Sequence, residues 1–186
     1  MEHEDGGDEI EALNQAGHEC LEKGDLEGAG GRFSRALELA IRSGDLRRQA
    51  GLLNNLGHVQ VRLGRLEEAL GTFERAALAF EQIGERIEAA WQRGNAGSVC
   101  RDRGEHDAAF RYYRLALEVF EETGDRMGIA DQSGNIAYIH AMEDEPEAAL
   151  PWFEKARAIY EELGEERKAR LAARNIELLR SRGARE

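Results

Sequence analysis

The fold is decided by the stretch from Leu52 to Glu85, LLNNLGHVQVRLGRLEEALGTFERAALAFEQIGE, whose pattern recurs along the chain at intervals of forty residues. Six columns of small, aromatic or amide residues keep this interval without an insertion. The columns are Ala29, Ala69, Ala109 and Ala149; Phe33, Phe73, Tyr113 and Phe153; Ala36, Ala76, Ala116 and Ala156; Gly44, Gly84, Gly124 and Gly164; Gly17, Gly57, Gly97 and Ala137; and Gln15, Asn55, Asn95, Asn135 and Asn175. A fixed period of this length is typical of arrays in which each repeat packs on the next.

Each repeat is predicted to contain two helices. Apolar residues recur at helical spacing before Gly64 and again from Leu66 to Phe80. Glycine can adopt the left-handed conformation that ends a helix. The acid that follows Gly at several breaks suits the positive end of the next helix dipole. The sequence therefore predicts an all-α helical solenoid built from antiparallel helix pairs.

The quoted stretch also resembles a known repeat. Gly57, Ala69, Phe73 and Ala76 follow the order small residue, Ala, aromatic and Ala that is found in the tetratricopeptide repeat. The ordinary unit has about 34 residues, whereas here the second helix continues to Gly84 and the usual Pro is missing. Forty-residue units with an Asn two places before the Gly resemble the repeats of kinesin light chains and of the Leu-Gly-Asn-repeat polarity adaptors. The resemblance implies a right-handed superhelix whose first helices line a concave groove.

The repeats occupy nearly the whole chain. We expect four of them, at about 9–44, 45–84, 85–124 and 125–164, followed by a capping helix over 165–182. Residues 1–8 are acidic, contain two glycines and offer no apolar cluster to bury, so we expect a disordered tail there.

Composition excludes several classes of partner. The net charge of −12 argues against general binding of nucleic acid, which depends on Lys and Arg, and against anionic membrane surfaces. No run approaches the roughly 18 apolar residues of a membrane helix, and the start lacks the pattern of a signal peptide. We therefore expect a cytoplasmic protein. Cys20 and Cys100 lie two repeats apart, too far for a disulfide, and are expected to be reduced and partly buried.

One face of the first helices carries the predicted peptide-binding residues, at spacings of i, i+4, i+7 and i+11. They are Asn55, Asn95, Asn135, Asn175, Trp91, His58, Arg62, Tyr138, Ser98 and Asp131. Each Asn side chain offers both donors and an acceptor, as an extended peptide backbone does. The resemblance implies that the family uses Asn at these positions to hold peptides. The alternative is structural, with each Asn bonding the backbone of an adjacent helix and setting the stacking.

The sequence offers little for catalysis. It contains no Gly-rich phosphate loop, and no His/Cys cluster has metal-ligand spacing. His18 and His58 lie one repeat apart, too far to share a metal. We therefore expect no enzyme activity, no cofactor and no metal, and predict a module that binds an extended peptide or partner tail. The partner itself is not identified.

Two other functions remain open. The first is a self-associating scaffold, a homodimer formed through terminal helices in which Leu171, Leu178 and Leu179 leave part of the cap apolar. The second is a regulatory sensor that binds a signalling peptide or a small molecule.

Overall fold

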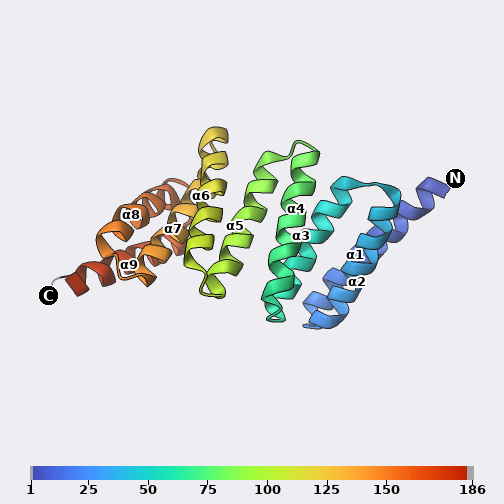
Figure 1. Cartoon of the computed structure of the whole chain (residues 1–186), viewed down its shortest axis with the longest axis horizontal. Helices are drawn as coiled ribbons and strands as arrows, with labels where there is room; N and C mark the ends of the chain where they lie inside the picture. Colours follow the sequence, from blue (N-terminus) through green and yellow to red (C-terminus); the bar gives the residue numbers. More distant parts are fainter. Residues whose placement is uncertain (1, 184–186) are drawn as a thin grey trace. The chain divides into compact units, whose positions relative to one another are not determined.

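The computed structural model describes residues 2–183, with side chains described for residues 7–181. Over this range the chain forms helices and turns and no strand, which confirms the all-α prediction. Nine helices follow one another in these described residues (Figure 1): α1 (Glu2–Glu22), α2 (Leu26–Ser43), α3 (Leu46–Arg62), α4 (Leu66–Gln82), α5 (Arg86–Asp102), α6 (His106–Thr123), α7 (Arg126–Met142), α8 (Pro146–Glu162) and α9 (Glu166–Gly183).

The chain divides into two compact units, Met1–Val99 and Cys100–Glu186. In the first unit α1 packs on α2, α2 on α3 and α3 on α4. In the second unit α6 packs on α7, α7 on α8 and α8 on α9. From α1 to α4 and from α6 to α9, each helix therefore packs on the next, as the helical solenoid predicts.

The Gly-acid breaks between helices have a specific structural role. Gly44 and Gly124 end α2 and α6 in the left-handed conformation, with φ of 72° and 74°. The following acids then cap the next helix: the Asp45 carboxylate accepts the backbone N–H of Arg48 at 3.0 Å, and Asp125 accepts that of Gly128 at 2.9 Å. These acids therefore satisfy helix donors directly.

The N-terminal segment differs from the expectation. Residues 1–8 were expected to be disordered, but α1 begins at Glu2, while Met1 lies outside the described residues. The acidic composition that argued for disorder is also favourable in the first turns of a helix, where the dipole is positive. The first helix of the first repeat is consequently longer than the others, at 21 residues.

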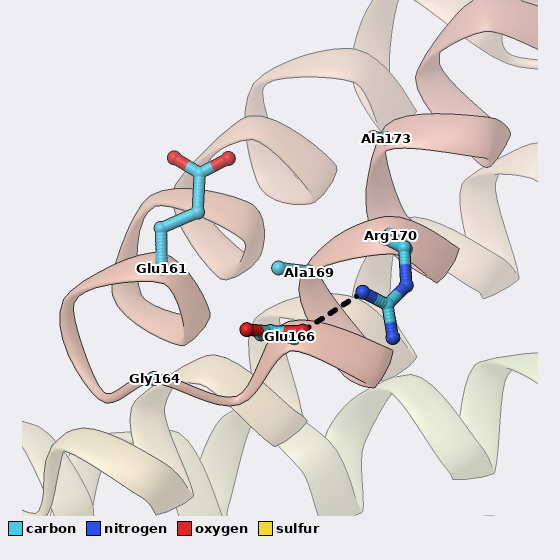
Figure 2. A pocket seen from close by; sticks show the side chains of 6 residues that line it. All are labelled: Glu161, Gly164, Glu166, Ala169, Arg170 and Ala173. Atoms are coloured by element: carbon cyan, nitrogen blue, oxygen red, sulfur yellow. Dashed lines mark hydrogen bonds and ion pairs between the residues drawn. The ribbon is translucent and has the colours of Figure 1, made fainter.

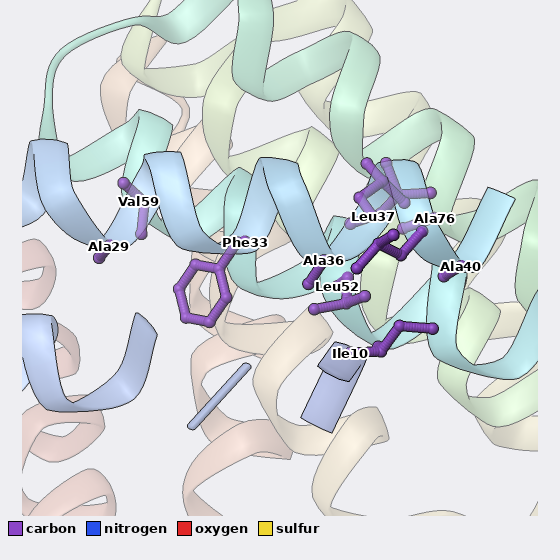
Figure 3. Close-up of a cluster of buried hydrophobic side chains, with 11 residues drawn as sticks. Ile10, Ala29, Phe33, Ala36, Leu37, Ala40, Leu52, Val59 and Ala76 are labelled. Atoms are coloured by element: carbon purple, nitrogen blue, oxygen red, sulfur yellow. The ribbon is translucent and has the colours of Figure 1, made fainter. Parts of the chain in front are cut away.

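The buried core of the first unit comes from the apolar and small columns (Figure 3). Its cluster joins α1, α2, α3 and α4, through Ile10, Ala29, Phe33, Ala36, Leu37, Leu39, Ala40, Leu52, Leu53, Val59 and Ala76. The recurring Gly column has a steric cause. A Cβ atom on Gly17 would lie 2.5 Å from the Phe33 ring, and one on Gly57 would lie 2.6 Å from the Phe73 ring. The glycine column therefore marks a close approach between helices at these two positions.

The capping helix α9 completes the core of the second unit. Ile176 and Leu179 of α9 are buried with Phe153 of α8. The expectation that Leu179 contributes to an apolar outer face is wrong, because its side chain points into this core and is 8% exposed. Leu171 and Leu178 are exposed, as expected.

Two further expectations can be compared with the structure. Cys20 is half-buried, as expected, whereas Cys100 is buried more completely than expected, and neither cysteine is in a disulfide. Within the described part of the chain, no helix combines the length and the apolar character needed to cross a membrane.

Candidate functional site

The predicted peptide-binding residues all lie on the first helices of the repeats. Asn55, His58 and Arg62 belong to α3; Trp91, Asn95 and Ser98 to α5; Asp131, Asn135 and Tyr138 to α7; and Asn175 to α9. Those on α3 and α5 belong to the first unit, and those on α7 and α9 to the second. The contacts of these residues are therefore described unit by unit.

In the first unit, the Asn55 amide links neighbouring first helices. Its Nδ2 lies 3.2 Å from Oδ1 of Asn14 and 3.3 Å from Nε2 of His18, both on α1. Nδ2 of Asn54, the residue before Asn55 on α3, donates to Oδ1 of Asn55 at 3.4 Å. Three amides and one imidazole thus form a connected polar group between α1 and α3. Asn14 and Asn54 were not predicted, although their forty-residue spacing is visible in the sequence.

These amides surround a hollow of about 210 Å³. Its lining combines amide, charged and apolar groups, from Ile10, Glu11, Asn14, Arg48, Gly51, Leu52, Asn54 and Asn55. The Arg48 guanidinium is oriented by Asp45, with Nη1 2.9 Å from Oδ2. The hollow can therefore present hydrogen-bond donors and acceptors beside a small apolar floor.

The second unit repeats this linkage with a different partner. Nδ2 of Asn175 on α9 donates to the Tyr138 hydroxyl on α7 at 3.3 Å. The sequence offset of this pair is 37 residues, the same as between His18 and Asn55. An amide on one first helix therefore meets a ring side chain on the preceding one in both units.

The remaining two amides bond within their own helices. Asn95 donates to Gln92 at 3.4 Å and Asn135 to Gln132 at 3.3 Å. Both Gln side chains are buried. Each hydrogen bond described for the four predicted Asn side chains ends on another side chain rather than on the backbone.

The predicted peptide-binding residues on this face of the first helices are called the stripe below. Two of its ring side chains pack edge-on against the buried aromatic column. The ring centroids are 5.2 Å apart for His58 and Phe73 and 5.4 Å apart for Tyr138 and Phe153. Partial burial lowers the pKa of His58, because desolvation disfavours its charged form. His58 is thus a neutral, oriented side chain at neutral pH. Ser98 donates to the backbone of its own helix, at Gly94 O, over 3.2 Å.

Asp131 has a structural engagement that the sequence did not reveal. Its carboxylate accepts the Tyr160 hydroxyl at 2.7 Å and Nζ of Lys168 at 2.8 Å. Burial, together with this bond, raises the pKa of Tyr160 well above its usual range. Because Tyr160 lies on α8 and Lys168 on α9, Asp131 joins three helices of the second unit. This places Asp131 in the attachment of the capping helix.

Two predicted residues remain to be placed. Trp91 is half-buried on α5, and Arg62 is exposed on α3.

The repeat pattern decides the family. The profile of the tetratricopeptide repeat matches residues 8–82, 48–122 and 86–162, which together span most of the chain. The chain belongs to the tetratricopeptide repeat family. This confirms the resemblance seen in the sequence and makes the chain a protein-interaction module. The family is generally non-catalytic and binds protein partners.

Solved structures share this tetratricopeptide fold at low sequence identity. The apo form of RapI is 18% identical with a TM-score of 0.79, over 85% of this chain and 44% of RapI. BtubC (BKLC) from P. vanneervenii is 16% identical with a TM-score of 0.67, over 98% of this chain and 91% of BtubC. The STAND protein PH0952 from Pyrococcus horikoshii, which has a tetratricopeptide repeat sensor, is 17% identical with a TM-score of 0.82.

These likenesses define the fold alone. The match to PH0952 covers 88% of this chain but 25% of that protein, and this chain spans less than half of RapI. No curated protein was found to match the sequence.

A second hollow, of about 300 Å³, lies beside the turn between α8 and α9 (Figure 2). It is lined by Glu161, Gly164, Glu166, Ala169, Arg170 and Ala173, and none of these belongs to the predicted stripe. Arg170 pairs with Glu166 on the same helix at 3.0 Å. Both side chains are largely exposed, so this ion pair contributes little to the stability of the fold.

Proposed function

We propose that this tetratricopeptide repeat protein binds an extended peptide or partner tail along its first helices, with the Asn side chains holding the peptide backbone. The observation that carries the proposal is the convergence of Asn14, Asn54 and Asn55 around one hollow. An extended peptide presents alternating N–H and C=O groups, and a carboxamide can pair with both.

The existing bonds leave capacity for a ligand. Each carboxamide has two N–H donors and an oxygen with two lone pairs. The Asn55 oxygen accepts one N–H from Asn54, and its Nδ2 is directed at α1. Side chains that are already oriented lose less entropy on binding, so the same contacts that link the helices favour peptide capture.

Trp91 and two charged residues at the hollow supply selectivity in this proposal. Trp91 is half-buried on α5 and is the residue type most often found as an anchor in protein interfaces. Glu11 and Arg48 place opposite charges at the hollow, so a peptide carrying both charges is favoured over a uniformly acidic one.

The test replaces the amides of the hollow. Peptides selected from a random, unstructured library on the wild-type chain are labelled and titrated by fluorescence anisotropy. The double variant Asn54→Ala with Asn55→Ala is expected to bind them about tenfold more weakly, because each lost hydrogen bond contributes about 0.5–1.5 kcal/mol. Gln82→Ala, which removes an exposed amide from α4, is the matched control and leaves binding unchanged.

Stability is measured on the same variants, because Asn55 also links α3 to α1. If the double variant unfolds, Asn54→Ala alone separates the roles, since its described bond stays within α3. Selected peptides that bind this folded variant as tightly as the wild type contradict the proposal.

Association of two copies through α9 is a second candidate. Leu171 and Leu178 lie seven residues apart on one side of this helix and are 52% and 51% exposed. Burying one Leu side chain contributes about 1.5–3 kcal/mol, so Leu171→Glu with Leu178→Glu is expected to convert a dimer to monomer in light scattering. Leu78→Glu on α4 is the control. A wild-type chain that stays monomeric at every concentration excludes this candidate.

A further inference from the structure

The turn between α7 and α8 departs from the other turns within repeats. It reads Glu143-Asp144-Glu145, and Asp144 adopts φ of 60° where the equivalent positions carry Gly. The backbone N–H of Glu143 donates to Ile139 O at 3.1 Å, and that of Glu145 donates to His140 O at 2.9 Å. The turn therefore folds both glutamates back toward the last turn of α7.

This folding brings carboxylates next to two imidazoles. Nδ1 of His140 lies 2.7 Å from Oε2 of Glu145, and the ligand atoms of His140, Glu143 and Glu145 all lie within 4.8 Å of one another. Nδ1 of His106, at the start of α6, lies 3.6 Å from Oε1 of Glu143. Glu143 thus belongs to the cluster with His140 and Glu145 and also lies beside His106, so it connects the two imidazoles.

The two imidazoles are held in place. The His140 side chain is 19% exposed, and its ring packs edge-on against Phe110 with centroids 5.6 Å apart. The His106 side chain is 23% exposed. The glutamates are more exposed and can adjust, so fixed nitrogen donors are combined with adaptable oxygen donors.

The repeat itself does not require two of these residues. His106 and Glu143 stand where the other repeats carry side chains that do not bind metals at neutral pH. The equivalents are Leu26, Leu66 and Pro146 for His106, and Lys23, Leu63 and Arg103 for Glu143. The second unit therefore has a polar cluster that stacking does not explain.

We propose that His106, His140, Glu143 and Glu145 bind one divalent transition-metal ion of the zinc type. Around a tetrahedral ion with bonds of about 2.0–2.2 Å, ligand atoms lie about 3.4 Å apart. The distances of 2.7 Å between His140 and Glu145 and of 3.6 Å between His106 and Glu143 bracket that value, and rotation of the glutamates can bring the four groups around one ion. Imidazole favours zinc-type ions, whereas Mg²⁺ and Ca²⁺ prefer sites made of oxygen alone.

The cluster also has access to solvent. A hollow of about 540 Å³ adjoins it, with His106 and Glu143 among its lining residues. An incoming ion can therefore reach the donors without unfolding of the helices. The sequence did not predict the site, because its ligands come from two repeats and lack the spacing of a zinc motif.

The test uses the full chain, freed of metal with a chelator and titrated with ZnCl₂ by calorimetry near neutral pH. One ion per chain is expected. His106→Ala and His140→Ala are each expected to weaken binding at least about tenfold, the lower end of the loss seen when a metal's supporting residues are removed. Glu118→Gln, which removes an exposed carboxylate from α6 outside the cluster, is the control and leaves the affinity unchanged.

A second readout separates binding from folding. Zinc should raise the melting temperature of the wild type and leave that of the double His variant unchanged, since an ion stabilises only a state that binds it. If a His variant unfolds, Glu143→Gln removes a charged ligand while keeping its shape. A folded variant that binds zinc like the wild type overturns the proposal, as does equal affinity for Ca²⁺ and Zn²⁺.

Discussion

Replacing Phe73 with Ala lowers the free energy of unfolding by about 3–5 kcal/mol, the range for emptying a buried aromatic site. Phe73 on α4 is 1% exposed and fills the space that Gly57 leaves on α3. The expected loss is therefore near the upper limit for a single substitution in the first unit, as measured by denaturant unfolding.

The same substitution should also change the pKa of His58, which is one of the predicted peptide-binding residues. The His58 ring rests on Phe73, and burial lowers its pKa from the ordinary value of 6.5. Removing the phenyl ring admits water, so the pKa of His58 is expected to rise toward that value, as followed by NMR.

The direction of the His58 pKa shift also predicts how the stability of the wild type depends on pH. Because the folded pKa of His58 lies below the unfolded one, its contribution to stability is complete above pH 6.5 and is lost as the pH falls through the folded pKa.

Phe80→Ala on the same helix is the matched control, because Phe80 is half-buried. This variant should lose less free energy of unfolding than Phe73→Ala and leave the pKa of His58 unchanged. Equal losses for the two variants, or an unchanged His58 pKa in Phe73→Ala, would show that the aromatic column does not support the stripe.

The repeat columns were sufficient to predict the helices, because they record equivalent positions. Ala and Gly recur where helices approach closely, and Gly followed by an acid recurs where one helix ends and the next begins. These constraints act within one repeat or between adjacent helices, so each repeat displays them independently. The length of α1 was missed because an acidic segment is compatible both with disorder and with a helix N-terminus.

The contacts of the candidate site were harder to predict. Residues at equivalent positions of neighbouring repeats do not contact each other. Columns repeat every forty residues, whereas the side-chain bonds between neighbouring first helices join residues 37 or 41 apart. Asp131 therefore meets Lys168 rather than Leu171, its counterpart in the column. The offset depends on how the helices are displaced along their axes, and one repeat does not encode that displacement.

The His106 and His140 cluster shows the same limit. These residues occupy different columns and different helices, so neither periodicity nor motif spacing connects them. They lie near each other because α7 packs back along α6, which brings the end of α7 beside the start of α6. Their proximity is a property of the packed second unit.

Replacing Gly57 with Ala is expected to destabilise the first unit by about 1–3 kcal/mol, the usual penalty for overpacking. Helix propensity alone predicts the opposite, because Ala is favoured over Gly by about 1 kcal/mol in a helix interior. The steric effect should win, since the added Cβ would lie 2.6–2.9 Å from three atoms of the Phe73 ring. Thermal and denaturant unfolding measure the difference.

Gly51→Ala on the same helix provides the comparison. A Cβ at Gly51 would meet no heavy atom within 4 Å, so this variant should be stabilised by about 0.5–1 kcal/mol. If Gly57→Ala lowers the stability and Gly51→Ala raises it, contact between the helices, rather than backbone freedom, is the reason for glycine at position 57.

The fourth repeat offers an internal test of that steric cause. Ala137 occupies the Gly column there and is fully buried in the cluster that contains Phe153, so the position accepts a methyl group when its aromatic neighbour is suitably placed. In a Phe73→Leu background the ring is gone, and Gly57→Ala should then have little cost or even stabilise the chain. If the penalty is the same in both backgrounds, the two substitutions are additive, and contact with Phe73 is not what keeps glycine at this position.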